Sequence, residues 1–276
     1  MKTRIISGVV AVILMIVVLL LHKTFVFNLA FGLISAAAIA ELLRATKQLK
    51  FIEPAVACCA YAFIDAFMPV FHRNGWLTFF TNRLYFGALV LFMCVYYLRH
   101  HDKFTYKNFF LMLGVAILIP YSFGTLISMS ADPKAGVYLI VITMCGAWLA
   151  DTGAYFAGTF FGKTKLCPEI SPKKTVEGVV GGVIANGLLM MLVSLIFDFA
   201  DSDVSPRYFF ILLAGMLAAV VGLIGDLTAS IIKRQVGIKD YGNIMPGHGG
   251  VMDRFDSLLL VAPFMYYMYV QGLLVL

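Results

Sequence analysis

Nine apolar runs take up most of this chain, and each approaches the length of a membrane-spanning helix. A helix needs about 20 residues to cross the ~30 Å hydrocarbon core of a bilayer. Continuous apolarity does not follow the alternating pattern of membrane β-barrels, so helices are the expected form. We therefore predict an all-α polytopic membrane protein with about nine transmembrane helices, near residues 5–21, 25–43, 54–71, 84–98, 109–129, 136–161, 177–197, 208–232 and 257–275.

The composition leaves no room for a soluble domain. Hydrophobic residues make up 61% of the chain and charged residues only 13%, whereas soluble domains carry about 25% charged residues. The formal charge of +6 does not indicate nucleic acid as a partner, because cations of membrane proteins gather in cytoplasmic loops. The five cysteines form no spaced metal pair, and four lie in apolar runs, where cysteine packs as a small hydrophobe.

The basic residues predict the orientation in the membrane. With nine spans, sixteen of the 21 Lys and Arg residues fall in loops on one side. The other side receives five, namely Lys23, Arg73, Arg83, Lys134 and Arg207. By the positive-inside rule the N-terminus is cytoplasmic and the C-terminus is outside. The first run lacks a small-residue cleavage site, so we expect it to remain as an anchor.

Asp151 is an acid in the middle of the sixth apolar run. An ionisable residue at membrane depth is costly and indicates function by default. Tyr155 and Gly158 follow at i+4 and i+7 and share its helical face. The alternative is an interhelical hydrogen bond between packed spans, although Asn or Ser would supply that without a charge.

The loop between the sixth and seventh runs carries Ser171, Lys173 and Lys174 just before a helix start. Cations, hydroxyls and free backbone N–H groups are the elements of a phosphate-binding loop. The GxxxxGK[ST] spacing of a Walker loop is absent. Any cytoplasmic loop is rich in lysine because of topology, so this loop alone does not establish a site.

The densest polar stretch runs from Ser230 to Asp256, and Asp226 precedes it inside the eighth apolar run. Ser230, Lys233 and Arg234 follow Asp226 at i+4, i+7 and i+8 and line one helical face. Asp226 would lie about 10 Å below Lys233 along the helix.

Asp253 and Asp256 form an i, i+3 pair where the ninth run begins. Carboxylates of two helices that converge near cations can hold Mg²⁺ together with substrate phosphates. The alternative is a set of interfacial charges in the first turn of the last span. This alternative leaves Asp226 and the glycine-rich turn unexplained. His248 lies in that turn, and it is either only a turn residue or a participant in the chemistry of the site.

The stretch resembles the signature of the phosphatidate cytidylyltransferases, the CDP-diacylglycerol synthases. The matching residues are Ser230-x-x-Lys233-Arg234-x4-Lys239-Asp240-x-Gly242 and Pro246-Gly-His248-Gly249-Gly250-x-x-Asp253-Arg254-x-Asp256. The segments Asp151-Thr-Gly-Ala-Tyr155 and Ser171-Pro-Lys-Lys-Thr-Val-Glu-Gly178 resemble the family too. Met245 departs from the expected Leu, Ile or Phe but is still apolar.

The resemblance implies that CTP and phosphatidate give CDP-diacylglycerol and pyrophosphate, with Mg²⁺ as cofactor and with or without a monovalent cation. It implies metal binding by Asp226, Asp253 and Asp256, with Asp151 as a further acid of the site. The implied catalytic set adds Lys233 and Arg254, and the substrate-binding set is Ser171, Lys173, Lys174, Ser230, Arg234, Lys239 and His248. Which cation binds which phosphate is left open.

The whole chain is then one integral membrane domain, in which residues 1–135 form a frame and residues 136–276 carry the site. The expected location is the inner membrane of a bacterium, with the site facing the cytoplasm, and a homodimer is one assembly that this reading allows. Two alternatives remain, a CTP-dependent polyprenol kinase and a transporter for an anionic lipid. A CDP-alcohol phosphotransferase is disfavoured because its DxxDGxxAR pattern is missing.

Overall fold

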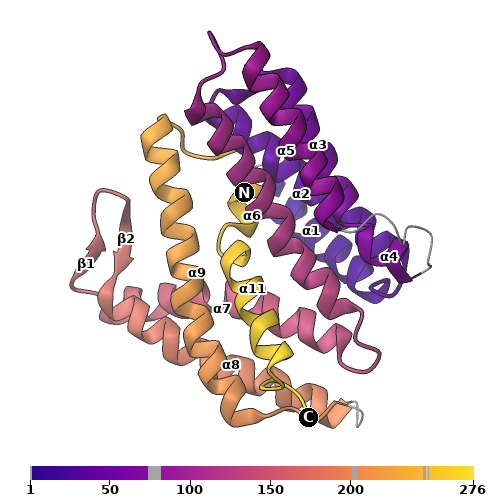
Figure 1. Ribbon diagram of the computed structural model, residues 1–276. Helices are drawn as coiled ribbons and strands as arrows, with labels where there is room; N and C mark the ends of the chain where they lie inside the picture. Colours follow the sequence, from indigo (N-terminus) through magenta and orange to yellow (C-terminus); the bar gives the residue numbers. More distant parts are fainter. Residues whose placement is uncertain (1, 74–81, 201–203, 245–246, 248) are drawn as a thin grey trace. The chain divides into compact units, whose positions relative to one another are not determined.

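A computed structural model describes residues 2–73, 82–200, 204–244, 247 and 249–276 (Figure 1). The described chain is mostly helical. Five of its helices are long and apolar enough to cross a membrane. These are α2 (Phe25–Ala45), α6 (Tyr106–Ser130), α7 (Gly136–Phe161), α8 (Val176–Ala200) and α9 (Tyr208–Val236). The prediction of a helical membrane protein is therefore confirmed, while the count of nine spans stays a prediction.

The other apolar runs are helical as well, but their helices are shorter. Three are α1 (Lys2–Leu20), α5 (Asn82–Arg99) and α11 (Leu258–Val270). The third run is divided between α3 (Ile52–Asp65) and α4 (Met68–Arg73). Two short helices complete the set, η1 (Gln48–Lys50) and α10 (Met252–Phe255).

A small β-hairpin, not foreseen from the apolar pattern, lies between α7 and α8 (Figure 1). Strands β1 (Lys165–Cys167) and β2 (Ser171–Thr175) pair antiparallel, with Lys165 opposite Thr175 and Cys167 opposite Ser171. The lysine-rich segment that was expected to be a loop therefore forms a hairpin, and its second strand leads directly into α8.

The chain forms two compact units. The first comprises residues 1–128 and 238–254, and the second comprises residues 129–237 and 255–276. The glycine-rich end of the signature stretch therefore belongs with the N-terminal helices. The expectation that residues 1–135 form a frame and residues 136–276 carry the site stays a prediction.

An aromatic cluster lies in the core of the first unit. Phe27 and Phe31 of α2 are buried and their rings pack together, and Phe31 also contacts Phe123 of α6. The buried Asn28 donates from Nδ2 to the carbonyl oxygen of Ala66 at 2.6 Å. This bond links α2 to the residue that follows α3.

The second unit is built on close contact between α7 and α8. Ala150, Ala154 and Gly158 repeat at four-residue spacing on α7, and Gly178 and Gly182 do so on α8. A Cβ atom on Gly182 would lie 2.8 Å from the carbonyl oxygen of Ala150, and one on Gly178 would lie 2.8 Å from that of Ala154. Small residues allow helix backbones in a membrane to approach this closely. We call these five residues the small-residue seam.

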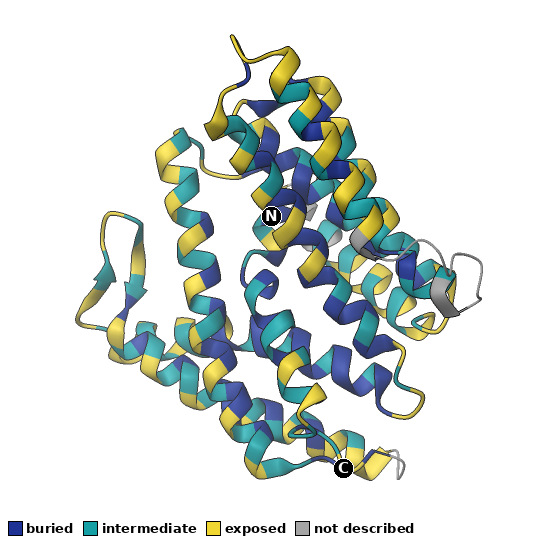
Figure 2. Cartoon of the chain, in the orientation of Figure 1, coloured by how far each residue is buried: buried dark blue, intermediate teal, exposed yellow. Residues whose placement is uncertain are grey.

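Asn186 joins a third helix to this pair. Its side chain is fully buried, and Nδ2 donates to the carbonyl oxygens of Gly146 on α7 (3.1 Å) and Gly215 on α9 (2.7 Å). Ile184, Leu188 and Leu192, at four-residue spacing on α8, are exposed. Exposed positions recur along the helices of the described chain (Figure 2). An apolar exterior with a polar bond inside is what a helix bundle in lipid requires.

The seam predicts different outcomes for two glycine-to-alanine substitutions. Gly182→Ala should destabilise the protein by about 1–3 kcal/mol, because the added methyl group forces α7 and α8 apart. Gly114→Ala in α6 is the matched control, since its Cβ would meet nothing within 4 Å. Thermal unfolding in detergent should show a lower Tm for Gly182→Ala only. Equal Tm values for the two variants would contradict the role of the seam.

Candidate functional site

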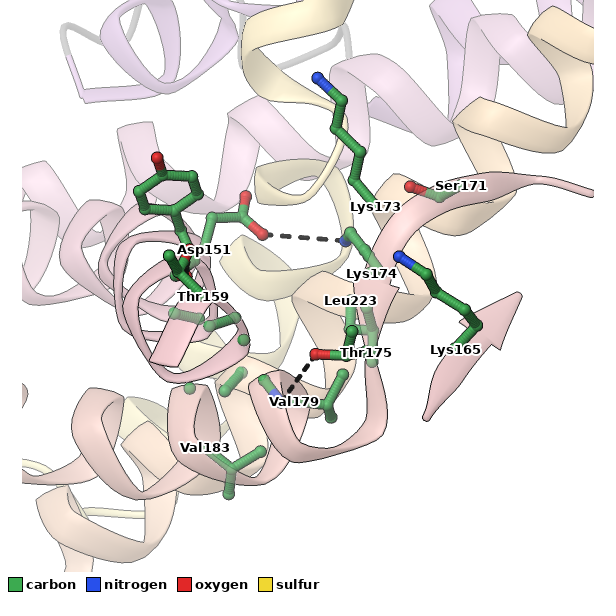
Figure 3. A pocket seen from close by; sticks show the side chains of 17 residues that line it. Asp151, Thr159, Lys165, Ser171, Lys173, Lys174, Thr175, Val179, Val183 and Leu223 are labelled. Atoms are coloured by element: carbon green, nitrogen blue, oxygen red, sulfur yellow. Dashed lines mark hydrogen bonds and ion pairs between the residues drawn. The ribbon is translucent and has the colours of Figure 1, made fainter. Parts of the chain in front are cut away.

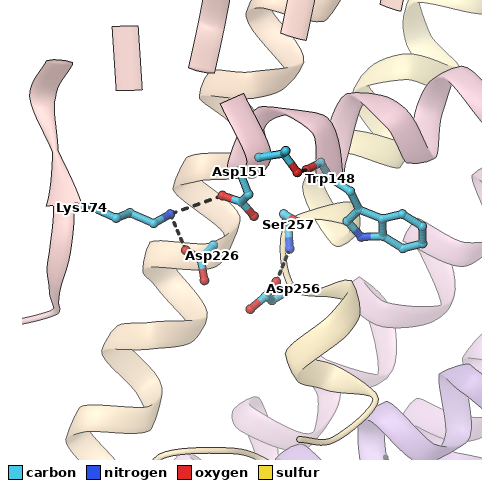
Figure 4. A network of polar contacts seen from close by, with 7 residues as sticks. Trp148, Asp151, Lys174, Asp226, Asp256 and Ser257 are labelled. Atoms are coloured by element: carbon cyan, nitrogen blue, oxygen red, sulfur yellow. Dashed lines mark hydrogen bonds and ion pairs between the residues drawn. The ribbon is translucent and has the colours of Figure 1, made fainter. Parts of the chain in front are cut away.

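An ion-pair triad lies in the second unit, made by Asp151 of α7, Lys174 of β2 and Asp226 of α9 (Figure 4). The Lys174 ammonium nitrogen is 2.5 Å from Oδ2 of Asp226 and 3.8 Å from Oδ1 of Asp151. The side chains of Lys174 and Asp226 are each 22% exposed, whereas that of Asp151 is 60% exposed. Lys174 and Asp226 thus form the sheltered part of the triad, and Asp151 is its open edge.

The hairpin is held so that Lys174 reaches these acids. The Thr175 hydroxyl accepts a hydrogen bond from the Gly178 N–H (3.2 Å) at the start of α8. The Glu177 carboxylate accepts from the backbone N–H groups of Lys163 and Thr164 at 3.1 Å. Both ends of the hairpin are therefore tied to the first turn of α8, and the sequence reading did not anticipate the roles of Thr175 and Glu177.

Asp256, just before α11, is the third carboxylate in this region (Figure 4). Its Oδ1 accepts a hydrogen bond from the Ser257 N–H at 2.8 Å. Burial, followed by the nearby Asp226 carboxylate, raises the pKa of Asp256 from 3.8 to about 7, while Lys233 acts in the opposite direction. A Cβ on Gly225 would lie 2.8 Å from the Asp256 carbonyl oxygen, so glycine lets α9 pack closely against this segment.

A cavity of about 470 Å³ lies beside the triad (Figure 3). Its polar lining includes Asp151, Lys165, Ser171, Lys173 and Lys174. Its apolar lining includes Ala154, Val179, Val183 and Leu223. Three ammonium groups beside apolar walls suit a ligand that carries both a phosphate and an apolar part.

The C-terminal end of α9 supplies further cations. Arg234 donates from Nε to the carbonyl oxygen of Ile170 in the hairpin turn at 3.3 Å, so this guanidinium links α9 to the hairpin. Lys233 and Arg234 both lie in the last turn, where the helix dipole stabilises positive charge. Ser230 lies one turn earlier and is partly buried. The helix ends at Gly237, whose φ of 73° is left-handed.

Three predicted site residues, Lys239, Asp253 and Arg254, belong to the first unit. Oδ2 of Asp253 accepts hydrogen bonds from the N–H groups of Tyr241 (2.7 Å) and Gly250 (3.0 Å). Asp253 therefore organises its own loop, and its predicted metal role stays a prediction. Lys239 and Arg254 are exposed. His248, Met245 and Pro246 lie outside the described residues.

The sequence reading passed over Glu41, which contacts the same loop. Glu41 lies in α2, is only 2% exposed, and accepts hydrogen bonds from the N–H groups of Val251 and Met252. The signal was available, since Glu41 is an acid inside the second apolar run and satisfies the argument that singled out Asp151.

The acids of the second unit are of the right chemical kind for Mg²⁺, which prefers carboxylate oxygens together with substrate phosphates. Asp151 and Asp226 already face one cation, the Lys174 ammonium group. Within the described ranges, no group of three or more His, Cys, Asp or Glu side chains is arranged to hold a metal ion. The donor types therefore fit Mg²⁺, and the ligand set stays a prediction.

Comparison with known proteins gives a consistent result over nearly the whole chain. The profile of the cytidylyltransferase family matches residues 2–271. The phosphatidate cytidylyltransferase of Bacillus subtilis is 34% identical over 271 residues, which are 97% of this chain and 97% of the relative. That of Haemophilus influenzae is 33% identical, with 98% of each chain covered. That of Rickettsia bellii is 36% identical over 66% of this chain and 79% of the relative.

The pKa of Asp256 predicts a pH-dependent stability. Because the folded state binds this proton more tightly, the stabilisation is present at low pH and is lost as the pH rises through 7. In buffer with a chelator, the parent should lose about 2 kcal/mol between pH 5 and 8 relative to Asp256→Asn. Denaturation midpoints of both proteins at each pH measure this difference. The control is Asp198→Asn at the exposed end of α8, and an Asp256→Asn profile parallel to the parent's would contradict the assignment.

Proposed function

The chain belongs to the cytidylyltransferase family, and on that premise we propose that it transfers a cytidylyl group from CTP to phosphatidate. The products are CDP-diacylglycerol and pyrophosphate. The observation that carries the proposal is the Lys174 triad beside a cavity with both cationic and apolar lining. The phosphatidate cytidylyltransferases of two bacteria match almost the full length of the chain, which supports the same substrates.

In the proposed reaction, a phosphate oxygen of phosphatidate attacks the α-phosphorus of CTP. The bond from that phosphorus to the bridging oxygen breaks, and pyrophosphate leaves with the electron pair. Such a transfer depends on positioning and charge neutralisation, so no nucleophile from the protein is needed. Both substrates are polyanions, and their mutual repulsion adds to a barrier that the cations of the site reduce.

The residues of the second unit divide this work. Lys173 and Lys174 would bind phosphate oxygens at the cavity, and Lys233 and Arg234 would add positive charge at the end of α9. Ser171 and Ser230 would donate hydroxyl hydrogen bonds. Asp226 and Asp256, with Asp151 as the outer acid, would hold Mg²⁺. When bound, Mg²⁺ neutralises phosphate charge and orients the reacting oxygens.

In the first unit, Lys239 and Arg254 would bind substrate phosphates, with His248 in the same glycine-rich loop, and Asp253 would contribute to metal binding. A monovalent cation beside Mg²⁺ is part of the proposal, although no residue is assigned to it. The family profile matches residues 2–271, which include this loop, and that match supports these roles.

The proposed topology has nine spans, with the N-terminus and the site in the cytoplasm of a bacterium and the C-terminus outside its inner membrane. The sixteen-to-five distribution of Lys and Arg supports it, as does the cytosolic location of CTP. Cysteine-accessibility labelling from each side of the membrane would test the orientation. A homodimer also stays a proposal, for which the mass of the detergent-solubilised protein is the test.

A single substitution tests the proposed chemistry. With CTP, phosphatidate and Mg²⁺, the purified protein should release pyrophosphate and form CDP-lipid. Asp226→Asn should lower kcat by about 100-fold or more. The substitution removes a negative charge that would bind Mg²⁺ and that pairs with Lys174. Asp198→Asn should retain full activity, since it lies at the opposite end of α8 from Gly178, about 30 Å away.

Label in the cytosine ring of CTP separates the competing functions. Cytidylyl transfer places the label in the lipid, whereas a polyprenol kinase would release it as CDP. Transport of an anionic lipid without turnover of CTP would indicate a carrier. Product from a polyprenol but none from phosphatidate would overturn the proposal.

A further inference from the structure

Glu41 of α2 binds the loop that carries the end of the signature stretch, although the two are 210 residues apart in sequence. Its Oε1 accepts from the Val251 N–H at 3.0 Å, and its Oε2 accepts from the Met252 N–H at 2.9 Å. One carboxylate thus holds two consecutive amides, and each oxygen has its own donor. Such a pair of bonds fixes both the distance and the orientation of the Val251–Met252 backbone relative to Glu41.

The burial of Glu41 makes this contact specific. The residue is 2% exposed, and a buried carboxylate is costly unless hydrogen bonds satisfy it. No lysine or arginine in the described ranges lies within ion-pair distance of it. The two backbone donors therefore provide the compensation that is seen, and the contact persists only while the loop keeps its shape.

Two glycines of the loop lie against this carboxylate. A Cβ atom on Gly242 or on Gly250 would overlap the carboxylate oxygens of Glu41. Glycine at these two positions lets the loop backbone approach the Glu41 carboxylate closely. Both glycines lie in the stretch that resembles the family signature, and the structure gives them a common physical reason.

The amides of residues 250, 251 and 252 are all used in this arrangement. Asp253 accepts from the Gly250 N–H, and Glu41 accepts from the next two. These amides lead directly into α10, which carries Asp253 and Arg254. The direction in which those two side chains leave the backbone therefore depends on Glu41.

We propose that Glu41 is a positioning residue, which sets the orientation of Asp253 and Arg254 through the amides of Val251 and Met252. The inference rests on the proposed function, because it takes Asp253 and Arg254 as part of the cytidylyl-transfer site. Glu41 itself need not touch the substrate. Its effect should therefore appear mainly in kcat, with a rise in KM confined to the substrate whose phosphate Arg254 binds.

The test compares two substitutions on the same helix. Glu41→Gln keeps the size of the side chain but faces one amide N–H with an NH₂ group, which cannot accept its hydrogen bond. Asn28→Ala is the matched control, since Asn28 is buried on α2 and bonds the backbone of Ala66, outside the loop. Glu41→Asp retains both acceptor oxygens on a shorter stem and should recover part of the lost rate.

Three measurements are made on the full chain in detergent: Tm, the kinetic constants, and the rate of tryptic cleavage after Lys239. Glu41→Gln should lower kcat about 10–100-fold, the range found when outer partners of metal ligands are removed. It should also speed cleavage after Lys239, which is exposed at the edge of the loop. Asn28→Ala should lower Tm alone.

The proposal is overturned if Glu41→Gln lowers Tm as Asn28→Ala does while kcat and cleavage match the parent. Should Glu41→Gln fail to accumulate, Glu41→Asp is judged by the same measurements, and parental values of kcat and cleavage would again overturn the proposal. The proteolysis result is independent of the reaction. An inactive parent would therefore refute the proposed function, while a change in cleavage would still report on the Glu41 contact.

Discussion

The close contact between α7 and α8 is the constraint on which the second unit depends. Apolar side chains gain little by leaving lipid for one another, so helix association in a membrane relies on van der Waals contact and hydrogen bonds. The small-residue seam supplies the contact, and Asn186 supplies bonds to both neighbouring helices. Because the backbones meet near Gly158 and Gly178, the hairpin between them is held beside Asp151 and Asp226.

The contacts that compensate buried charges also join segments of the chain. Lys174, which emerges from the hairpin, neutralises two acids that belong to different helices. In the first unit, backbone amides compensate Glu41. Both arrangements satisfy a buried charge and bring together segments that are distant in sequence. The residues that lower the cost of burial are therefore also the residues that build the site.

Much of this could be predicted from local pattern. The apolar runs predicted the helices, because continuous apolarity over about 20 residues has few other solutions. Asp151 and Asp226 stood out as acids at membrane depth, and both are in the triad. The hairpin was missed because Ser171–Thr175 has neither apolar alternation nor the length that marks a strand. Glu41 was missed because it is a single acid in an apolar run, whereas glycine and charge are dense in the C-terminal half.

The sequence by itself determined the helical membrane class, the clustering of polar residues in the C-terminal half and the family, since hydropathy and motif spacing are properties of local sequence. Only the tertiary structure decided which two acids share Lys174, that Asp253 bonds its own loop and that Glu41 holds that loop. Such pairings depend on how helices pack. Packing in turn depends on contacts a few ångströms in size between residues up to 210 positions apart, which no local pattern encodes.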